Sequence, residues 1–316
     1  MLSTLPGSRA AAGLPDGGSG VVNALTIDVE DYFQVSAFDG HVSRDDWPSF
    51  ESRVSRNTDR LLELFDEAGT RATFFVLGWV AERYPELIRR IHAGGHELAS
   101  HGFGHQLVYT QTPERFREDL RRARATIEAC TGAPVLGYRA PSFSITRESL
   151  WAFDVLIEEG YAYDSSVYPI HHDRYGIPGW PRHPHVVERA GGRIWEIPGS
   201  TVRWGRFNLP VGGGGYFRLL PYRWTRLGID RLNRVESTGA IFYLHPWEID
   251  PAQPRLPVGL LTGIRHYRNL GKTEARLRRL LREFRFSTMQ TMLGLAAGAP
   301  LTDVPLSSVP GKEISL

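Results

Sequence analysis

Two histidines four positions apart form the pattern in this chain that most strongly suggests chemistry. His101 and His105 follow a short apolar run, and Gly102 and Gly104 stand between them. Imidazoles at this spacing can present ring nitrogens to one divalent cation. The glycines disfavour a helix interior and favour a tight loop where the backbone approaches something bound. The pair therefore predicts a metal site in a loop, although an isolated pair of this kind is more often an ordinary surface feature.

A cluster of carboxylates near the N-terminus is the second such feature. Asp28, Glu30 and Asp31 come at the end of a β-branched run, residues 21–27. A buried strand that ends in acidic residues is the arrangement by which α/β barrels place catalytic groups. Buried carboxylates cost free energy unless a cation or hydrogen bonds offset that cost. We therefore favour a metal-binding or catalytic role for the cluster over a solvated turn.

Two basic residues stand at the ends of other predicted strands. Arg139 follows the run 135–138, and His245 follows the run 240–244. A barrel gathers the C-terminal ends of its parallel strands on one face. We therefore expect Arg139 and His245 to lie near the carboxylates and the paired histidines.

These residue types together indicate a hydrolytic metal site. Two imidazoles and one carboxylate with open positions are typical of a catalytic site, since a structural zinc is closed by four protein ligands. Such a cation lowers the pKa of bound water and polarises a carbonyl oxygen. A second carboxylate can accept the proton of that water, and a histidine across the pocket can protonate the leaving group. Arg139 fits as a partner that keeps the base ionised, so the predicted reaction is metal-assisted hydrolysis of an amide or ester.

The elements that must position these residues alternate regularly along the chain. We expect helices over 53–68, 85–93, 113–131, 147–159 and 273–284, and further strands over 72–78, 96–100, 161–163 and 194–198. Strands and helices in alternation predict parallel βα units and an α/β fold. Residues 168–189 are rich in proline, histidine and aromatic residues without periodicity, which predicts a long functional loop over one mouth of the barrel. The glycine run 212–215 lacks the Lys-Ser or Lys-Thr of a phosphate loop and fits a close wall for a sugar.

Length and composition are those of one globular enzyme domain. The 316 residues carry 37 basic and 35 acidic side chains, a net charge of +2 that is too balanced to indicate a nucleic-acid partner. The single Cys130 excludes an intramolecular disulfide and is a poor nucleophile candidate. No apolar run of about 18 residues predicts a transmembrane helix, and no secretory signal is visible, so we expect a cytoplasmic protein. We expect a disordered leader at 1–20, a catalytic domain at 21–293 and a disordered tail at 294–316.

Five stretches in order resemble the motifs of the polysaccharide deacetylases, the NodB-homology group also known as carbohydrate esterase family 4. They are residues 26–31, 100–105, 137–142, 164–166 and 242–248, and the resemblance spans about residues 22–290. Residues 28–33, 174–178, 213–218 and 266–270 are most similar to the branch associated with exosortase and exopolysaccharide loci, with the peptidoglycan deacetylase and allantoinase-like branch next. The resemblance implies a distorted, incomplete, seven-stranded (β/α) barrel, a divalent metal, usually zinc, and removal of acetyl groups from N-acetylated sugars.

The resemblance also implies roles for individual residues. Asp28 matches the catalytic base, Arg139 its partner, His245 the general acid, and His101 and His105 the metal ligands. Many members place the metal carboxylate directly after the base and others leave one residue between. Here Val29 follows the base, so that both Glu30 and Asp31 are candidate ligands.

Candidate substrate contacts come from aromatic residues and from the arginine motif. We expect them at Phe103, Pro141, Trp180, Tyr216 and Trp247, although core packing is the commoner use of any single aromatic residue. The family often continues its arginine motif with Pro-Tyr or Pro-Trp, whereas Ser142 and Phe143 follow Pro141 here. We therefore expect the oxyanion donor to be a backbone N–H near Phe103 or in this segment.

The leading hypothesis is a metal-dependent enzyme that deacetylates an N-acetylhexosamine of an exopolysaccharide or cell-wall polysaccharide. One alternative is a hydrolase of a small amide or cyclic ureide, as in the allantoinase-like branch. A second alternative, from another class, is a carbohydrate-binding protein whose catalytic site is dead.

Overall fold

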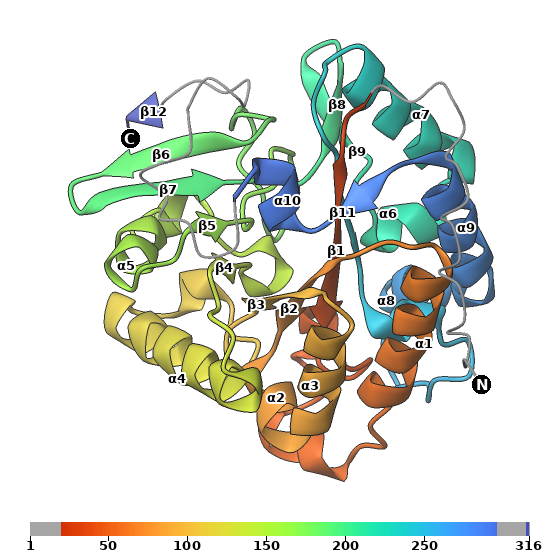
Figure 1. Cartoon of the computed structure of the whole chain (residues 1–316). Coiled ribbons are helices and arrows are strands. Elements are labelled where there is room, and N and C mark those ends of the chain that lie inside the picture. Colours follow the sequence, from red (N-terminus) through yellow and green to blue (C-terminus); the bar gives the residue numbers. More distant parts are fainter. Residues whose placement is uncertain (1–19, 296–313, 316) are drawn as a thin grey trace, which may run out of the picture.

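A largely parallel sheet forms the centre of the computed structural model, which describes residues 20–295 and 314–315 (Figure 1). The strands are β1 (Asn23–Val29), β2 (Thr73–Val76), β3 (Glu97–Ser100), β4 (Gly137–Tyr138), β5 (Tyr163–Asp164), β6 (His185–Arg189), β7 (Gly192–Glu196), β10 (Ile241–Leu244), β11 (Phe286–Ser287) and β12 (Ile314–Ser315). Their order is β10-β1-β2-β3-β4-β5-β7-β6-β12, with β11 paired to β1. Neighbours from β10 to β7 are all parallel, and only β6 runs antiparallel to β7. The predicted α/β class is confirmed.

Helices connect and cover these strands. The α-helices are α1 (Val54–Glu67), α2 (Gly78–Arg83), α3 (Pro85–Ala93), α4 (Pro113–Thr131), α5 (Ala152–Glu158), α6 (Gly214–Leu219), α7 (Tyr222–Arg234), α8 (Leu260–Tyr267), α9 (Leu270–Glu283) and α10 (Met289–Leu293). The 3-10 helices are η1 (Ser36–Phe38), η2 (Arg44–Ser49), η3 (Val108–Thr110), η4 (Pro141–Phe143), η5 (Arg147–Ser149) and η6 (Pro246–Ile249).

The ends of α4 follow from local chemistry. Thr112 caps its first turn, Pro113 stands at its first position, and Gly132 ends it at φ 73°.

Several boundaries differ from the sequence-based expectation. The helix expected over 147–159 is divided into η5 and α5, and the strand expected over 161–163 lies at β5. The segment 168–189 contains strand β6, which pairs with β7 rather than forming a loop throughout. A hairpin that was not expected, β8 (Thr201–Trp204) with β9 (Phe207–Pro210), forms a separate two-stranded sheet.

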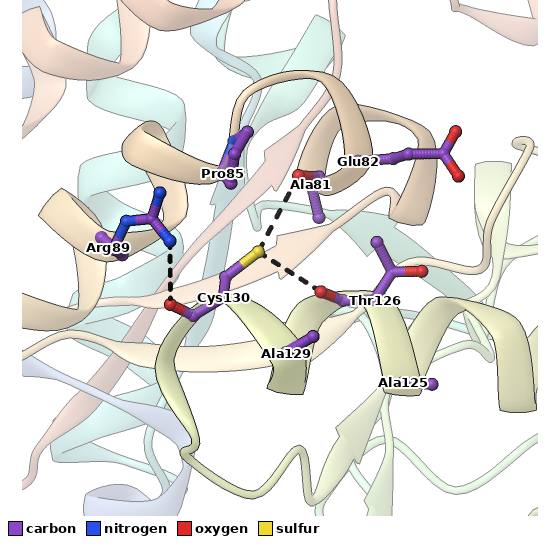
Figure 2. A pocket seen from close by; sticks show the side chains of 8 residues that line it. All are labelled: Ala81, Glu82, Pro85, Arg89, Ala125, Thr126, Ala129 and Cys130. Atoms are coloured by element: carbon purple, nitrogen blue, oxygen red, sulfur yellow. Dashed lines mark hydrogen bonds between the residues drawn. The ribbon is translucent and has the colours of Figure 1, made fainter.

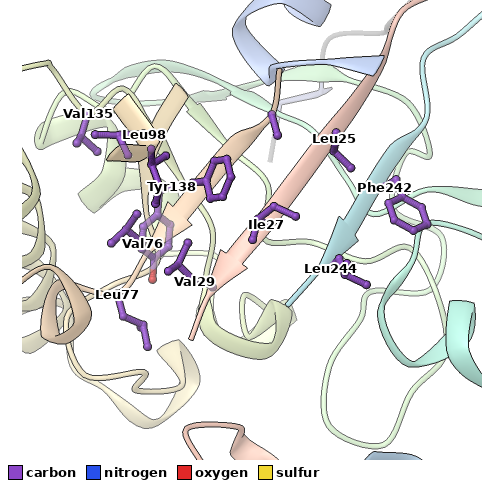
Figure 3. Packing of buried hydrophobic residues seen from close by; sticks show 14 of the residues in the cluster. Leu25, Ile27, Val29, Val76, Leu77, Leu98, Val135, Tyr138, Phe242 and Leu244 are labelled. Atoms are coloured by element: carbon purple, nitrogen blue, oxygen red, sulfur yellow. The ribbon is translucent and has the colours of Figure 1, made fainter. Parts of the chain in front are cut away.

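The two faces of β1 enter different environments. Leu25, Ile27 and Val29 belong to the main apolar cluster with residues of β2, β10 and the helices, and Figure 3 shows them beside Val76 and Leu244. Alternate strand residues point to opposite sides, so Ala24, Thr26 and Asp28 face the other way. Ala24 there joins a second apolar cluster with residues of β2, β3, β5 and β7. This inner side, enclosed by several strands, is where Asp28 is held.

The chain ends fall largely outside the described residues. Of the expected leader 1–20, only Gly20 is described, and of the expected tail 294–316, residues 294–295 and 314–315 are described. The last two form β12, which pairs with β6. Within the described residues, no helix combines the length and apolarity needed to cross a membrane.

Candidate metal centre and active site

The acidic turn and the histidine loop lie side by side because they follow neighbouring segments of one parallel sheet. Glu30 comes directly after β1, and His101 directly after β3, with β2 between the two strands. The loop turns at Gly102, whose φ is 73°, and a Cβ there would lie 2.7 Å from the Asp119 carboxylate. His105 itself adopts a positive φ of 51°. The loop therefore holds a backbone that few side chains tolerate, and strain of this kind is concentrated at functional sites.

Three side chains converge as a metal ligand set would. One ligand atom each of Glu30, His101 and His105 lies within 4.8 Å of the other two, and all three residues are buried. Glu30 Oε2 lies 2.8 Å from His105 Nε2 but accepts no hydrogen bond from the described residues. A buried carboxylate oxygen without such a partner is costly unless a cation neutralises it. Two imidazoles and one carboxylate with open positions fit a catalytic divalent metal.

Hydrogen bonding sets the tautomer of one imidazole. His101 Nδ1 lies 2.8 Å from the carbonyl oxygen of Arg139, which can only accept, so Nδ1 carries the hydrogen and Nε2 keeps its lone pair for a metal. Burial lowers the pKa of His101 to about 4, although Asp28 acts in the opposite direction. His101 is therefore neutral at pH 7, as a metal ligand must be.

Glu30 is the ionised member of the set. Burial raises its pKa, but His105 and His245 more than offset that effect and lower the pKa to about 2. Trp247 Nε1 donates to the other oxygen, Glu30 Oε1, over 3.3 Å. His105 therefore lies at one oxygen of the Glu30 carboxylate and Trp247 at the other. The carboxylate carries its charge at neutral pH.

Asp31 is placed away from this set, which corrects its candidacy as the metal carboxylate. Its Oδ2 accepts from Ser52 Oγ at 2.8 Å and from the backbone N–H groups of Arg53 at 2.7 Å and Val54 at 3.0 Å. These donors stand at the N-terminus of α1, where backbone N–H groups lack helical partners. Asp31 therefore caps α1, and Glu30 is the carboxylate that faces the histidines.

Arg139 and Asp28 form a buried pair on the inner side of the sheet. Arg139 Nη1 donates to Asp28 Oδ1 over 2.7 Å and to Thr26 Oγ1 over 2.8 Å. Its Nη2 donates to Ser165 Oγ over 3.1 Å. Asp28 Oδ2 lies 3.8 Å from His245 Nε2, so this oxygen is directed toward the other side of the site. The arginine therefore fixes one oxygen of the carboxylate, and the other faces His245.

His245 faces the carboxylates from β10. Its Nε2 lies 3.4 Å from Glu30 Oε1, and its Nδ1 lies 2.7 Å from Glu248 Oε1. Burial lowers the pKa of His245, but Glu30 and Glu248 outweigh it and raise the pKa to about 9. An imidazolium held in this way is a proton donor at neutral pH.

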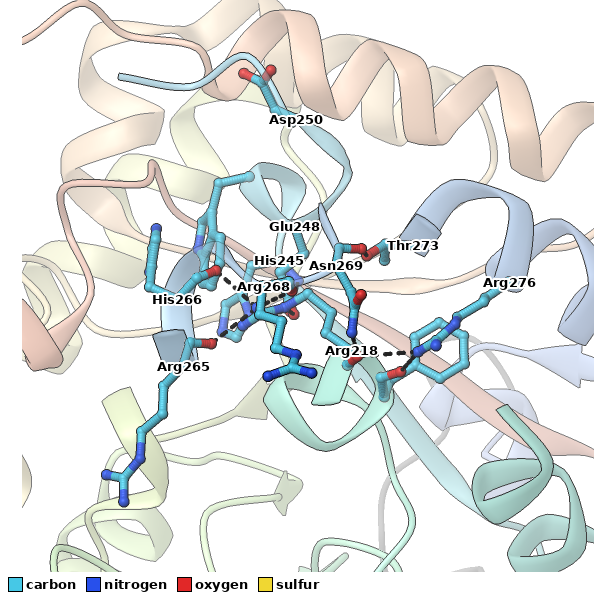
Figure 4. A network of polar contacts seen from close by, with 12 residues as sticks. Arg218, His245, Glu248, Asp250, Arg265, His266, Arg268, Asn269, Thr273 and Arg276 are labelled. Carbon is cyan, nitrogen blue, oxygen red and sulfur yellow. Dashed lines mark hydrogen bonds and ion pairs between the residues drawn. The ribbon is translucent and has the colours of Figure 1, made fainter. Parts of the chain in front are cut away.

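Glu248 and Arg218 support His245 from behind, and the sequence reasoning missed both. Arg218 Nε is hydrogen-bonded to Glu248 Oε2, and both side chains are buried (Figure 4). Glu248 could have been found, since it stands three residues after His245, within one turn. Arg218 ends the stretch 213–218, which carries the resemblance, but it lies 30 residues before Glu248 in the chain and no local spacing indicates that the two side chains pair.

Two of the expected aromatic substrate contacts are instead packing residues. Trp180 is buried and stacks on Phe153, with ring planes 2° apart and centroids 6.1 Å apart. Trp247 is buried between the rings of His245 and His266, at 5.1 and 4.1 Å. Neither face of Trp247 is open to a sugar, and its role is to hold Glu30 and His245.

The oxyanion donor was expected to be a backbone N–H near Phe103 or in the segment after Arg139, and the N–H of Phe103 itself is already engaged. The Phe103 N–H donates to Asp119 Oδ2 over 2.9 Å, and the Arg122 guanidinium lies 3.5 Å from the centre of the Phe103 ring. Pro141 is buried at the start of η4. Of the expected substrate contacts, Tyr216 keeps exposed surface, with its hydroxyl 3.4 Å from that of Tyr175.

Cys130 lies in a separate hollow between α4 and the α2–α3 segment. Figure 2 shows it beside Ala81 and Thr126, whose carbonyl oxygens lie 3.8 and 3.3 Å from its sulfur. Burial raises the pKa of the thiol, which makes it a weaker nucleophile. The expectation that Cys130 is a poor nucleophile agrees with this environment.

Sequence comparison links the two halves of the chain to different family models. Residues 42–156 match the polysaccharide deacetylase model, and residues 165–294 match a domain of unknown function. A chitooligosaccharide deacetylase of Sinorhizobium fredii is 38% identical over 100 residues, which cover 31% of this chain and 44% of the relative. A peptidoglycan deacetylase of Helicobacter pylori is 33% identical over 117 residues, which cover 36% and 37%. The chain spans less than half the length of these curated relatives.

Both matched segments contribute to the site, together with Asp28 and Glu30, which precede them in the chain. His101, His105 and Arg139 belong to the first, whereas Tyr216, His245 and Glu248 belong to the second. Strand β10 of the second segment pairs with β1, so the domain of unknown function completes the same sheet.

Solved structures share this fold over nearly the whole chain. A Mycobacterium smegmatis structure of the polysaccharide deacetylase type aligns with a TM-score of 0.62 and 20% identity, covering 98% of both chains. An allantoinase aligns with a TM-score of 0.58 and 16% identity, covering 88% of this chain and 90% of that one. At these identities the likeness concerns the fold. Residues 42–156, in contrast, match the polysaccharide deacetylase model in sequence, and the named relatives are similar to about a third of the chain.

Proposed function

We propose that the protein removes N-acetyl groups from an N-acetylated glycan by metal-assisted hydrolysis. The observation that carries the proposal is the convergence of Glu30, His101 and His105 opposite Asp28 and His245. A divalent cation held by the first three would lower the pKa of water and polarise the acetyl carbonyl. Zinc suits two imidazoles and one carboxylate with open positions.

The remaining residues supply the proton transfers. Asp28, held in place by the hydrogen bond from Arg139, accepts the proton of the attacking water. His245 donates the proton on Nε2 to the departing sugar nitrogen, and Glu248 holds Nδ1 so that Nε2 faces the site. The amide C–N bond breaks, and acetate and a free amino sugar are released.

The substrate class follows from the relatives and from the resemblance. Proteins named as chitooligosaccharide and peptidoglycan deacetylases are similar to part of this chain. The polysaccharide deacetylase model matches the segment that carries His101, His105 and Arg139. The resemblance of residues 28–33 and 213–218 to the exosortase-associated branch favours an exopolysaccharide. Tyr216, half-exposed next to Tyr175, is the proposed contact for a sugar face.

Acetate release and metal content of the purified full chain test this proposal. Acetylated glucosamine oligomers and polysaccharides would be compared with allantoin and simple amides, using Asp28→Asn as the inactive control. We expect acetate from glycans, one metal per chain, and loss of activity on chelation. Turnover of the small amides alone would favour the ureide hydrolase. Glycan binding without acetate release by the metal-loaded protein would favour the binding protein.

A further inference from the structure

An apolar and basic surface lies on α8 and the residues around it. Three of its large apolar side chains are exposed: Leu260 by 80%, Leu261 by 72% and Ile264 by 41%. Arg255, Arg265 and Arg268 are exposed in the same segment, and the sequence has no acidic residue from 251 to 273. We call these six residues the α8 face.

The opposite side of α8 is firmly attached to the protein. His266 is buried and its Nε2 lies 2.8 Å from Gln253 Oε1. Arg218 Nη1 donates to the carbonyl oxygens of Arg265 at 2.9 Å and His266 at 2.8 Å (Figure 4). Buried polar contacts therefore hold α8 in place. Its apolar residues face solvent although the helix is firmly packed on its other side.

The α8 face also adjoins the candidate active site. The same Arg218 that binds the α8 carbonyls is paired with Glu248, which holds His245. The ring of Trp247 lies between those of His245 and His266. Burial raises the pKa of Tyr216, and Arg265 of the α8 face is close enough to act against that rise, so a partner bound to the face would lie on the Tyr216 side of the site.

We propose that the α8 face docks on a membrane surface that carries anionic lipid headgroups. Apolar side chains inserted at the boundary between headgroups and acyl chains, with arginines among the phosphates, are the arrangement by which amphipathic helices bind membranes. The charge of the face argues against a second copy of this chain as the occupant. A symmetric dimer through α8 would bring two sets of three arginines together without acidic residues of the segment between them.

Docking would hold the candidate active site next to the bilayer. The membrane binding itself does not depend on the proposed deacetylation. Only the conclusion about which substrate the enzyme meets there rests on the proposed function. If both hold, the substrate glycan is one attached to, or emerging from, a membrane surface.

Vesicle co-sedimentation of the full chain tests the docking directly. The protein would be mixed with vesicles of phosphatidylcholine alone or of phosphatidylcholine with phosphatidylglycerol, at low and high salt. We expect binding to the anionic vesicles that weakens with salt. Leu260→Ser with Leu261→Ser should lower the association constant about tenfold or more. Arg265→Gln and Arg268→Gln should each lower it about fivefold.

A matched control uses exposed apolar residues on another helix. Leu227→Ser with Val235→Ser, from α7 and its C-terminal end, should bind vesicles as the unaltered protein does. All variants should keep their thermal unfolding temperature and their turnover of soluble oligosaccharides. Absence of binding to anionic vesicles, or equal binding by the α8 and α7 variants, would overturn the proposal. So would a dimer in sedimentation velocity that the α8 substitutions dissociate while no vesicle binding is seen, since the occupant would then be a second copy.

Discussion

Arg139 and Asp28 are joined by a 2.7 Å hydrogen bond between side chains that solvent hardly reaches, with Arg139 0% and Asp28 3% exposed. A charge-assisted bond of this length fixes the orientation of one carboxylate oxygen. Because Arg139 also donates to Thr26 and Ser165, it cannot turn away from Asp28 without losing other bonds. The pair therefore holds the Asp28 carboxylate in one orientation, as its proposed role of proton acceptor requires.

Asp28→Asn tests this role. The amide keeps an oxygen for Arg139 but cannot take a proton from water, so kcat should fall about 100-fold to 10,000-fold. Metal content and thermal unfolding should change little, since the shape and the hydrogen bond persist. A variant that retains near-normal acetate release would exclude Asp28 as the base.

Glu30→Gln and Asp31→Asn separate the two neighbouring carboxylates. Glu30→Gln should lose bound metal and acetate release, because it removes the charged ligand between His101 and His105. Asp31→Asn should keep its metal but unfold with a free energy lower by about 2 kcal/mol, because it weakens bonds to the first turn of α1. Metal analysis and urea unfolding measure the two effects, and loss of metal from Asp31→Asn would reverse the assignment.

Glu248→Gln tests the support of the proposed general acid. Burial lowers the pKa of His245, and the Glu248 charge helps to raise it, so removing that charge lowers the pKa. His245 must be protonated to donate, so the alkaline limb of the kcat/KM profile should move to lower pH. Glu236→Gln is the matched control, because Glu236 also lies between an arginine, Arg182, and a histidine, His183. The pH profile of Glu236→Gln should match that of the unaltered protein. If the alkaline limb of Glu248→Gln does not move, Glu248 does not raise the pKa of His245.

Tyr216→Ala should affect catalysis, whereas Trp180→Ala should affect stability. Tyr216 is partly exposed, so its loss should lower kcat/KM for oligosaccharides about tenfold with little change in stability. Trp180 is buried against Phe153, so its loss should lower the free energy of unfolding by about 3–5 kcal/mol. Kinetics and denaturant titration distinguish the two. Equal effects on KM would mean that both rings contact the sugar.

The residues that follow strand ends were predictable because a parallel sheet brings those ends together. Asp28, His101, Arg139 and His245 each come at or just after the end of an apolar strand, and β10, β1, β2, β3 and β4 are neighbours in the sheet. Helix α4 was predictable to the residue because Thr112, Pro113 and Gly132 are local signals for its ends.

Features decided by tertiary contacts could not be predicted in the same way. The choice between Glu30 and Asp31 depends on the entry of α1, since the backbone N–H groups of Arg53 and Val54 bind Asp31. From local sequence alone, the charged Arg218 would be expected at the surface and the aromatic Trp180 at a sugar-binding site. Each is buried by segments distant in the chain, and no local periodicity encodes that burial.

The burial of His185 should make the free energy of unfolding fall at acidic pH. It is buried, donates from Nδ1 to the His183 carbonyl, and its Nε2 has no hydrogen-bond partner among the described residues. Burial lowers its pKa to about 4, below the ordinary value of 6.5. Protonation therefore favours the unfolded chain. Its contribution to stability is complete above pH 6.5 and falls as the pH drops toward 4, by about 2 kcal/mol at pH 5.

His185→Asn isolates this contribution, because asparagine can donate the same hydrogen bond without titrating. The free energy of unfolding would be measured in urea at pH 7 and pH 5 for both proteins. The variant is expected to start lower at pH 7, owing to lost packing, and then to lose about 2 kcal/mol less than the unaltered protein on acidification. His41→Asn, at an exposed histidine, serves as the control and should leave the pH dependence as it is. Equal losses in the His185 variant and the unaltered protein would mean that His185 is not held neutral by the fold.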